Sequence, residues 1–244
     1  MNESKAIGFS LPLLVKISAF ACICLFSTLP SFGFCPQPNP TVACEFLNSD
    51  AVFVGKVISA RAVSPHGNQL DGWLYDLSTQ ELFRGSQTQV VEVFTENSSG
   101  SFFLDVGKTY LIFANELDGR LTITNCGNSA LLSKAQDTIR ELRGLEISKD
   151  AAIEGRISFS GIPDTGTHES GVQIVVRSDK GTFKTTSDRN GWFHLHVPPG
   201  EYSAEVLQTP GWVIVPYDLS YDNPNHFDAR KGHCSALQFI ARSK

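Results

Sequence analysis

Several features that would direct this chain of 244 residues to a particular chemistry are missing from it. It has no basic run or stripe, and its formal charge is −5, so nucleic acid is not an expected partner. No serine lies in a nucleophile elbow, and the glycines stand singly in turns instead of forming a loop that could cradle phosphate. The sequence therefore predicts a protein that is not an enzyme and needs no cofactor.

Residues 1–33 are predicted to be an export signal. Lys5 and Lys16 flank its start, an apolar core runs from Ile17 to Leu29, and the segment 31–33 supplies small residues for cleavage. The core is shorter than the about 20 apolar residues that span a membrane, so we expect no stable membrane insertion after cleavage. An uncleaved N-terminal anchor is the alternative. The predicted location is secreted, periplasmic or extracellular.

The chain after this leader is mildly acidic, because removal of two positive charges and one negative charge with the leader changes the formal charge from −5 to −6. About 210 residues remain, which suits two small domains. Cys22 and Cys24 leave with the leader. An even number of cysteines in an exported chain favours two disulfides, and four cysteines allow three pairings. The remaining cysteines are Cys35, Cys44, Cys126 and Cys234.

The first part of the exported chain consists mainly of β-rich runs separated by turn formers such as Asp118-Gly119. The predicted strands are Ala51–Ala60, Trp73–Phe83, Thr88–Thr95, Lys108–Ala114 and Leu121–Asn125. One helix is predicted from Ser133 to Leu142, with Ser133 as the N-cap and Gly144 as the stop. Five strands and a terminal helix suit a small closed barrel of the oligonucleotide-binding (OB) type, in an all-β fold.

A polar segment without apolar periodicity, Glu146 to Asp150, indicates a domain boundary. We therefore predict a barrel domain at 34–145, a linker at 146–151 and a second β domain at 152–244. Beyond the boundary come strand patterns at Ala152–Ile157 and Gly171–Val176, a turn at Asp188–Gly191 that is predicted to close a hairpin, and a second tight turn at Pro199-Gly200. Over about 90 residues this order resembles the carboxypeptidase regulatory-like or transthyretin-like domain. The resemblance implies an immunoglobulin- or transthyretin-like β-sandwich.

The barrel domain resembles the netrin-like module of the tissue inhibitors of metalloproteinases. The residues that carry the resemblance are the runs Asn48–Val57 and Gly107–Leu111, followed by Asp118-Gly119 and Cys126. The resemblance implies a barrel of the OB type. In these inhibitors an N-terminal cysteine binds the catalytic zinc of the protease through its amine and carbonyl oxygen. Here the expected mature chain starts at Phe34, which places the amine one residue ahead of Cys35.

The same resemblance implies a disulfide between Cys35 and Cys126. Cys44 and Cys234 would then be left to join across the two domains. A Cys44–Cys126 bond, or a buried free thiol at Cys44 or Cys234, is an open alternative. If the chain is inhibitory, the resemblance implies a protease-contact edge made by Phe34, Cys35, Pro36, Ser99 and Gly100.

Two further groups of residues are candidate sites. His194 and His196 lie on one face of a predicted strand and could hold a metal with His226 or His233, but a solvated strand face is the preferred interpretation, so no metal is predicted. A set of aromatic residues could line a carbohydrate or protein contact, although Trp212 and Tyr217 could equally be core or turn residues. These are Trp73, Tyr75, Trp212, Tyr217, Tyr221 and Phe227.

Taken together, these patterns predict an exported, non-catalytic, two-domain binding or structural protein of the cell envelope or extracellular space. The expected partner is a metalloprotease, another extracellular protein or a glycan. Two alternatives are kept: a true metalloendopeptidase inhibitor that acts through the N-terminal segment, and a carbohydrate-binding surface module.

Overall fold

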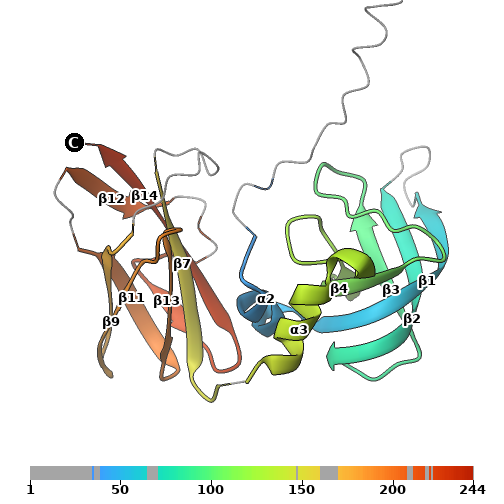
Figure 1. The fold of residues 1–244 in the computed structure, drawn as a ribbon, viewed down its shortest axis with the longest axis horizontal. Coiled ribbons are helices and arrows are strands. Elements are labelled where there is room, and N and C mark those ends of the chain that lie inside the picture. The colour runs from blue at the N-terminus through green and yellow to red at the C-terminus, as the bar shows by residue number, and fades with distance from the viewer. Residues whose placement is uncertain are drawn as a thin grey trace, which may run out of the picture. The chain divides into compact units, whose positions relative to one another are not determined.

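Five strands in the first half of the chain close into a barrel (Figure 1). The computed structural model describes residues 35, 39–64, 71–146, 148–159, 170–207, 211–217, 220 and 222–243. The barrel strands follow the order β1-β2-β3-β5-β4, β1 and β4 pair to close the ring, and β3 runs parallel to β5. This is the OB topology, as the sequence predicts. The strands are β1 (Ala51–Val63), β2 (Gly72–Arg84), β3 (Val90–Glu96), β4 (Thr109–Leu117) and β5 (Arg120–Thr122), and a short β6 (Ala130–Leu131) extends the sheet beside β4.

Closure depends on the long, bent strand β1. Its first half pairs with β4 while its whole length pairs with β2, and the register with β2 shifts at three places. Such bulges bend a strand and increase its twist, which a closed barrel requires. At Gly55 a Cβ atom would lie 2.9 Å from the Phe53 ring and 3.0 Å from the Cβ of Leu77. Glycine therefore allows the tight packing inside the bend.

The turn between β4 and β5 follows from its sequence. Leu117 pairs with Arg120, so the hairpin loop consists of Asp118 and Gly119 alone. Both have positive φ, 51° and 76°. A two-residue loop with two positive φ angles favours Asp-Gly, and the predicted turn is present.

The N-terminal halves of β1 and β4 are buried on both faces, because the barrel carries a second apolar cluster on its outside. Phe53 and Ile112 lie in the interior cluster, while their neighbours Val52 and Leu111 lie in the outer cluster. Side chains alternate across a strand, so both faces must be apolar here. The outer cluster is covered by two helices, α2 (Val42–Asn48) and α3 (Gln136–Gly144).

The helix prediction needs two corrections. Ser133 is not an N-cap: it lies in a 3₁₀ turn, Leu132–Lys134, and α3 begins at Gln136 with Ala135 as an N-cap that has no side-chain bond. Packing overrides capping here, because Ala135 is fully buried in the outer cluster. The second correction is α2, which the sequence did not predict because seven residues are too few to show a helical period.

The second half of the chain forms two four-stranded sheets, ordered β10-β7-β14-β12 and β13-β11-β8-β9. Their inner faces share one apolar core that contains, for example, Ile153 and Leu237 from one sheet and Ile174 and Tyr202 from the other. The all-β class, with a barrel followed by an immunoglobulin- or transthyretin-like sandwich, is therefore confirmed. The strands are β7 (Ala151–Phe159), β8 (Gln173–Ser178), β9 (Gly181–Thr186), β10 (Trp192–Val197), β11 (Gly200–Val206), β12 (Trp212–Pro216), β13 (Phe227–Ala229) and β14 (Cys234–Ser243).

The turn at Asp188–Gly191 does not close a hairpin. β9 pairs with β8 and β10 pairs with β7, so the turn carries the chain from one sheet to the other. Asp188 still makes the predicted tight turn, because its Oδ1 accepts the N–H groups of Asn190 and Trp192 at 2.7 and 2.9 Å. Local turn chemistry was therefore predicted correctly, and the pairing on either side of it was not.

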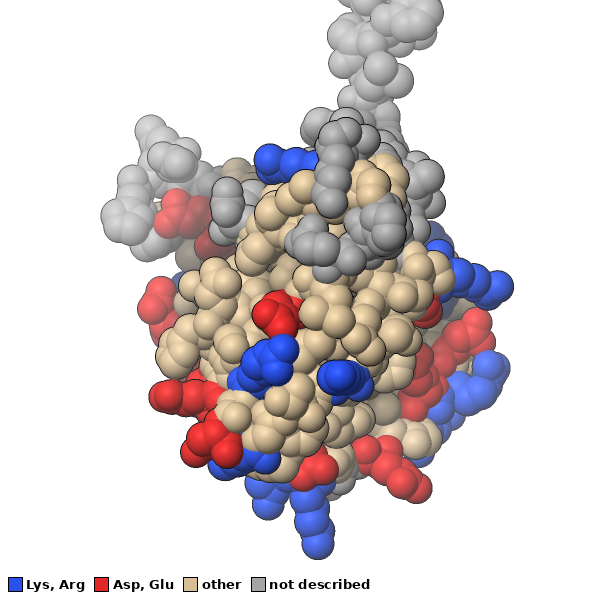
Figure 2. All heavy atoms as spheres, turned by 90° about the vertical axis from the view of Figure 1, so that its left-hand side faces the viewer, with Lys and Arg blue, Asp and Glu red and all other residues tan. Residues whose placement is uncertain are grey.

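Residues Gly33–Lys244 form one compact unit that includes both barrel and sandwich. β7 begins at Ala151, inside the segment 146–151 that the sequence assigns to a linker. On the face of the molecule in Figure 2, Lys and Arg side chains are interspersed with Asp and Glu side chains. Among the described residues, no helix has the length and apolar character that crossing a membrane requires.

Candidate functional site

The first candidate site is an edge of the barrel where Cys35, which follows the predicted leader, is held by a disulfide. Cys35 is bonded to Cys126. Next to it, Asn125 donates its backbone N–H to Gly100 O at 2.9 Å and its Nδ2 to Ser99 O at 3.1 Å. The structure thus brings together Cys35, Ser99 and Gly100, three of the five proposed protease-contact residues, and Phe34 and Pro36 lie outside the described residues. We call Cys35, Ser99, Gly100, Asn125 and Cys126 the stapled edge.

Glu45 on α2 binds the chain segment that follows Cys126 of this edge. Its Oε2 accepts the backbone N–H of Asn128 at 2.7 Å and the side-chain Nδ2 at 2.6 Å. A Cβ at Gly127 would lie 2.1 Å from Glu45 Oε1, so any other residue there would displace the carboxylate. Burial raises the pKa of Glu45 to about 7, although both Asn128 bonds act in the opposite direction. Glu45 therefore has a pKa near neutral pH and lies in contact with Gly127 and Asn128.

A second disulfide joins the barrel to the sandwich. Cys44 of α2 is bonded to Cys234, the first residue of β14. Beside it, Asn48 makes a reciprocal pair with the backbone of Cys234: Nδ2 donates to the carbonyl oxygen at 2.8 Å, and Oδ1 accepts the N–H at 2.9 Å. The disulfide and the Asn48 hydrogen bonds both come from α2, so this short helix ties the barrel to the sandwich.

The Asn48 contact occupies part of an open strand edge. The N-terminal half of β14 has β7 on one side, whereas β12 pairs only with its C-terminal half. On the unpaired side, Asp222 accepts the N–H of Ala236 at 2.8 Å and Ser220 accepts the N–H of Gln238 at 3.0 Å. Side chains thus take the place of a missing neighbouring strand, which satisfies backbone groups that burial would otherwise leave unpaired.

Replacing Asn48 with alanine is expected to lower the free energy of unfolding by about 1–3 kcal/mol, because the buried N–H and carbonyl groups of Cys234 lose their partners. Urea unfolding followed by tryptophan fluorescence measures this. Asn115→Ala, an exposed asparagine on β4, is the matched control and should change the midpoint little. A midpoint for Asn48→Ala equal to that of the control would contradict the role given to this pair.

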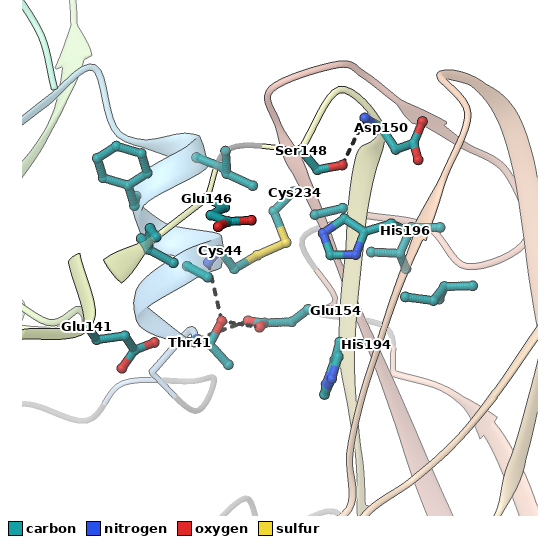
Figure 3. A pocket seen from close by; sticks show the side chains of 17 residues that line it. Thr41, Cys44, Glu141, Glu146, Ser148, Asp150, Glu154, His194, His196 and Cys234 are labelled. Carbon is teal, nitrogen blue, oxygen red and sulfur yellow. Dashed lines mark hydrogen bonds between the residues drawn. A yellow bond between two sulfur atoms is a disulfide. The ribbon is translucent and has the colours of Figure 1, made fainter. Parts of the chain in front are cut away.

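The second candidate site is a cavity of about 370 Å³ beside this junction (Figure 3). Its walls come from α2, the end of α3, the segment that follows it, β7 and β10. We call it the barrel–sandwich cleft. Its acidic lining residues are Glu141, Glu146, Asp150 and Glu154, and its larger apolar lining residues are Phe46, Leu47, Leu145, Ile153 and Leu195.

Glu154 is the most buried charged group of the cleft, with 5% of the residue exposed. Thr41 binds it twice: the backbone N–H donates to Oε1 at 3.0 Å and the hydroxyl donates to Oε2. Thr41 is also the N-cap of α2, since its hydroxyl oxygen accepts the N–H of Cys44 at 3.2 Å. Burial raises the pKa of Glu154, while the Thr41 bonds and nearby His194 act in the opposite direction. Glu154 therefore links β7 to the start of α2.

Sequence reasoning did not single out Thr41, Asn48 or Glu154. A signal was present for Glu154, because it is an acidic residue in the otherwise apolar start of a strand, on the face opposite Ile153 and Ile157. No local signal distinguishes Asn48, since its partner Cys234 lies 186 residues away.

The histidines considered for a metal site are not brought together as ligands. His194 and His196 are exposed on β10 and line the cleft. Among the described residues, one group places three potential ligand atoms within 4.8 Å of one another, and it consists of Cys44, Glu154 and Cys234. Its two sulfur atoms are already bonded to each other, so they do not offer thiolates to a metal.

Most of the aromatic residues proposed as a contact surface belong to the two cores. Tyr75 and Phe227 are buried, and Trp73 and Trp212 pack against the barrel and sandwich cores. Tyr217 is partly buried, and Tyr221 lies outside the described residues. These four therefore do not form an exposed binding surface, and for Trp212 the interpretation as a core residue is correct.

Comparisons with known proteins add little to this geometry. No protein-family model matches the chain, and no curated protein matches it. Three similar solved structures are the TIE protein of Bacillus anthracis (TM-score 0.31, 10% identity, 80% of this chain and 35% of that chain), the major pilin subunit BcpA of Bacillus cereus (0.29, 11%, 75% and 41%) and the pilus-presented adhesin Spy0125 (0.26, 11%, 60% and 38%). This chain therefore spans less than half the length of each. TM-scores of this size establish neither a family nor a function for this chain.

Proposed function

We propose that this protein is an exported, non-catalytic, two-domain binding protein that presents the stapled edge to an extracellular partner. The observation that carries the proposal is the pairing of all four cysteines beyond the leader, Cys35 with Cys126 and Cys44 with Cys234. Paired cysteines of this kind are characteristic of oxidising compartments, where disulfides persist. Each bond also has a separate structural effect: the first holds the start of the exported chain, and the second holds the sandwich to the barrel.

The stapled edge has the properties of a presented contact surface. Ser98 and Ser99 are exposed, and the Asn125 side chain and backbone N–H, bonded to the carbonyl oxygens of Ser99 and Gly100, hold the loop against the disulfide. A surface held in one conformation loses little entropy when it binds a partner. Loops of this kind, positioned by a rigid scaffold, commonly carry binding residues.

The finer proposal is that the partner is a secreted metalloprotease, which rests on the resemblance to the tissue inhibitors of metalloproteinases. A mature chain that starts at Cys35 would offer its amine and carbonyl oxygen to the protease zinc. A start at Phe34, which we expect, leaves contact through the stapled edge without chelation. N-terminal sequencing and intact mass of the exported protein distinguish the two starts.

The inhibitor form is tested with a panel of secreted zinc endopeptidases and a fluorogenic peptide substrate. We expect inhibition at micromolar protein and its loss in Gly100→Arg, because a side chain there projects from the edge and its Cβ would meet only Ser98 Oγ, at 3.6 Å. Gly144→Arg, at a glycine with nothing within 4 Å of its Cβ, is the matched control and should inhibit like the wild type.

Two results would count against these proposals at different levels. The absence of inhibition across the panel removes the metalloprotease partner and leaves an exported binding protein for another partner. Recovery of the protein in the cytoplasm with all four thiols free removes the exported binding protein itself.

A further inference from the structure

We propose that the barrel–sandwich cleft binds a basic amphipathic segment of a partner protein. A lysine or arginine side chain of that segment would enter between the carboxylates, and its apolar neighbours would contact the floor. This inference goes beyond the proposed function, because it concerns a different surface from the stapled edge and requires no protease.

Charge is the first support for this occupant. Four carboxylates line the cleft, from Glu141, Glu146, Asp150 and Glu154, and no lysine or arginine is among the described residues that line it. The two arginines of α3 are paired outside the cleft, Arg140 with Asp137 at 2.8 Å and Arg143 with Glu81 at 2.7 and 2.9 Å. A concave site lined by one sign of charge concentrates field lines and attracts the opposite charge.

The apolar floor is the second support, because it separates this cleft from a simple acidic surface. Leu47, Leu145 and Leu195 are only partly buried and line the cavity together with the Cys44–Cys234 disulfide. Lysine and arginine carry aliphatic stems that cover apolar surface while the charged group stays in a polar environment. A basic amphipathic segment therefore matches both the floor and the acidic residues, whereas a small inorganic cation matches only the latter.

Rigidity is the third support. The barrel wall and the sandwich wall are tied by the Cys44–Cys234 bond, by the Asn48–Cys234 pair and by the Thr41–Glu154 pair. Figure 3 shows the Thr41–Glu154 contact and the disulfide beside each other at the cavity. A preformed cavity of about 370 Å³ lies at the lower end of the size range of ligand sites and needs no closure before it binds.

The test uses two synthetic peptides, acetyl-LKLKL-amide and acetyl-LELEL-amide, titrated into the full exported chain. We expect calorimetry to give a Kd below about 1 mM for the lysine peptide and at least tenfold weaker binding for the glutamate peptide. We also expect amide NMR shifts to cluster at residues 41–47, 145–154 and 194–196. Raising the salt concentration should weaken binding, since exposed charges contribute to it.

Charge-reversal variants test whether the lysine peptide binds in the cleft. Glu146→Lys combined with Asp150→Lys is expected to weaken the lysine peptide about tenfold or more. Glu116→Lys combined with Glu201→Lys makes the same change in net charge at exposed positions that do not line the cleft, and should bind like the wild type. Gly100→Arg should also bind like the wild type, so this inference and the stapled-edge proposal can fail separately.

Three results would overturn the inference. The first is equal affinity for the two peptides, and the second is absence of binding up to about 1 mM. The third is a dimer, detected by light scattering, that disappears in the Glu146→Lys, Asp150→Lys variant, because a second copy of this chain would then occupy the cleft.

Discussion

Replacing Cys44 and Cys234 together with serine is expected to lower the free energy of unfolding by up to about 5 kcal/mol and to separate the thermal transitions of barrel and sandwich. The bond closes a loop with a sequence separation of 190 residues, and a cross-link that closes so long a loop strongly lowers the conformational entropy of the unfolded chain. Differential scanning calorimetry measures both changes. Limited proteolysis should show faster cutting near residues 146–150, because this connection no longer has the disulfide beside it.

The matched control is the pair of substitutions Cys35→Ser and Cys126→Ser, which removes a bond with a sequence separation of 91 residues inside the first half of the chain. It should lower stability by a similar amount and leave cutting near 146–150 unchanged. Non-reducing peptide mapping tests the connectivity itself. Detection of a Cys44–Cys126 peptide, or of Cys234 as a free thiol, would show that no disulfide joins the two halves.

The free energy of unfolding is expected to fall between pH 5 and pH 8, by up to about 3 kcal/mol from Glu45 alone. The pKa of Glu45 is about 7 in the folded protein against an ordinary 4.5. Between these two pH values the folded state holds a proton that the unfolded state has lost. The stabilisation is complete below pH 4.5 and is lost as the pH rises through 7. Burial also raises the pKa values of Glu154 and Asp222, which act in the same direction. Urea unfolding at several pH values measures the slope.

Glu45→Gln should remove the part of this slope that comes from Glu45, because the glutamine can still accept the Asn128 bonds but does not ionise. At pH 8 the variant is expected to be more stable than the wild type, and at pH 5 the two should be nearly equal. Glu116→Gln, at an exposed position, controls for the loss of one carboxylate. The explanation fails if Glu45→Gln keeps the wild-type slope.

Most strands were predictable because their signals are local. The apolar alternation and turn residues around Asp118-Gly119 define a hairpin within a few residues, and the structure has it there. Asp188 illustrates the limit of such signals: it forms the predicted turn, yet the strands on either side pair with different sheets. Pairing depends on how whole sheets stack, and a turn of four residues carries no information about that.

The stapled edge was partly accessible from the sequence, because the family resemblance supplied Cys35, Cys126 and the Ser99-Gly100 segment. The barrel–sandwich cleft was not. α2 is seven residues long, and its contacts with Cys234 and Glu154 join positions more than 110 residues apart. A single sequence shows neither the helix nor the partners.

The sequence by itself determined an all-β chain with a cysteine set suited to export and with two successive strand patterns, since periodicity, turn residues and composition act over short distances. Only the tertiary structure decided how α2 lies against both halves and which backbone groups of β14 are bonded to side chains. It also decided that four carboxylates and several apolar side chains line one cavity. These features depend on packing between segments far apart in the chain, and that packing brings Glu45 and Glu154 out of water and shifts their titration.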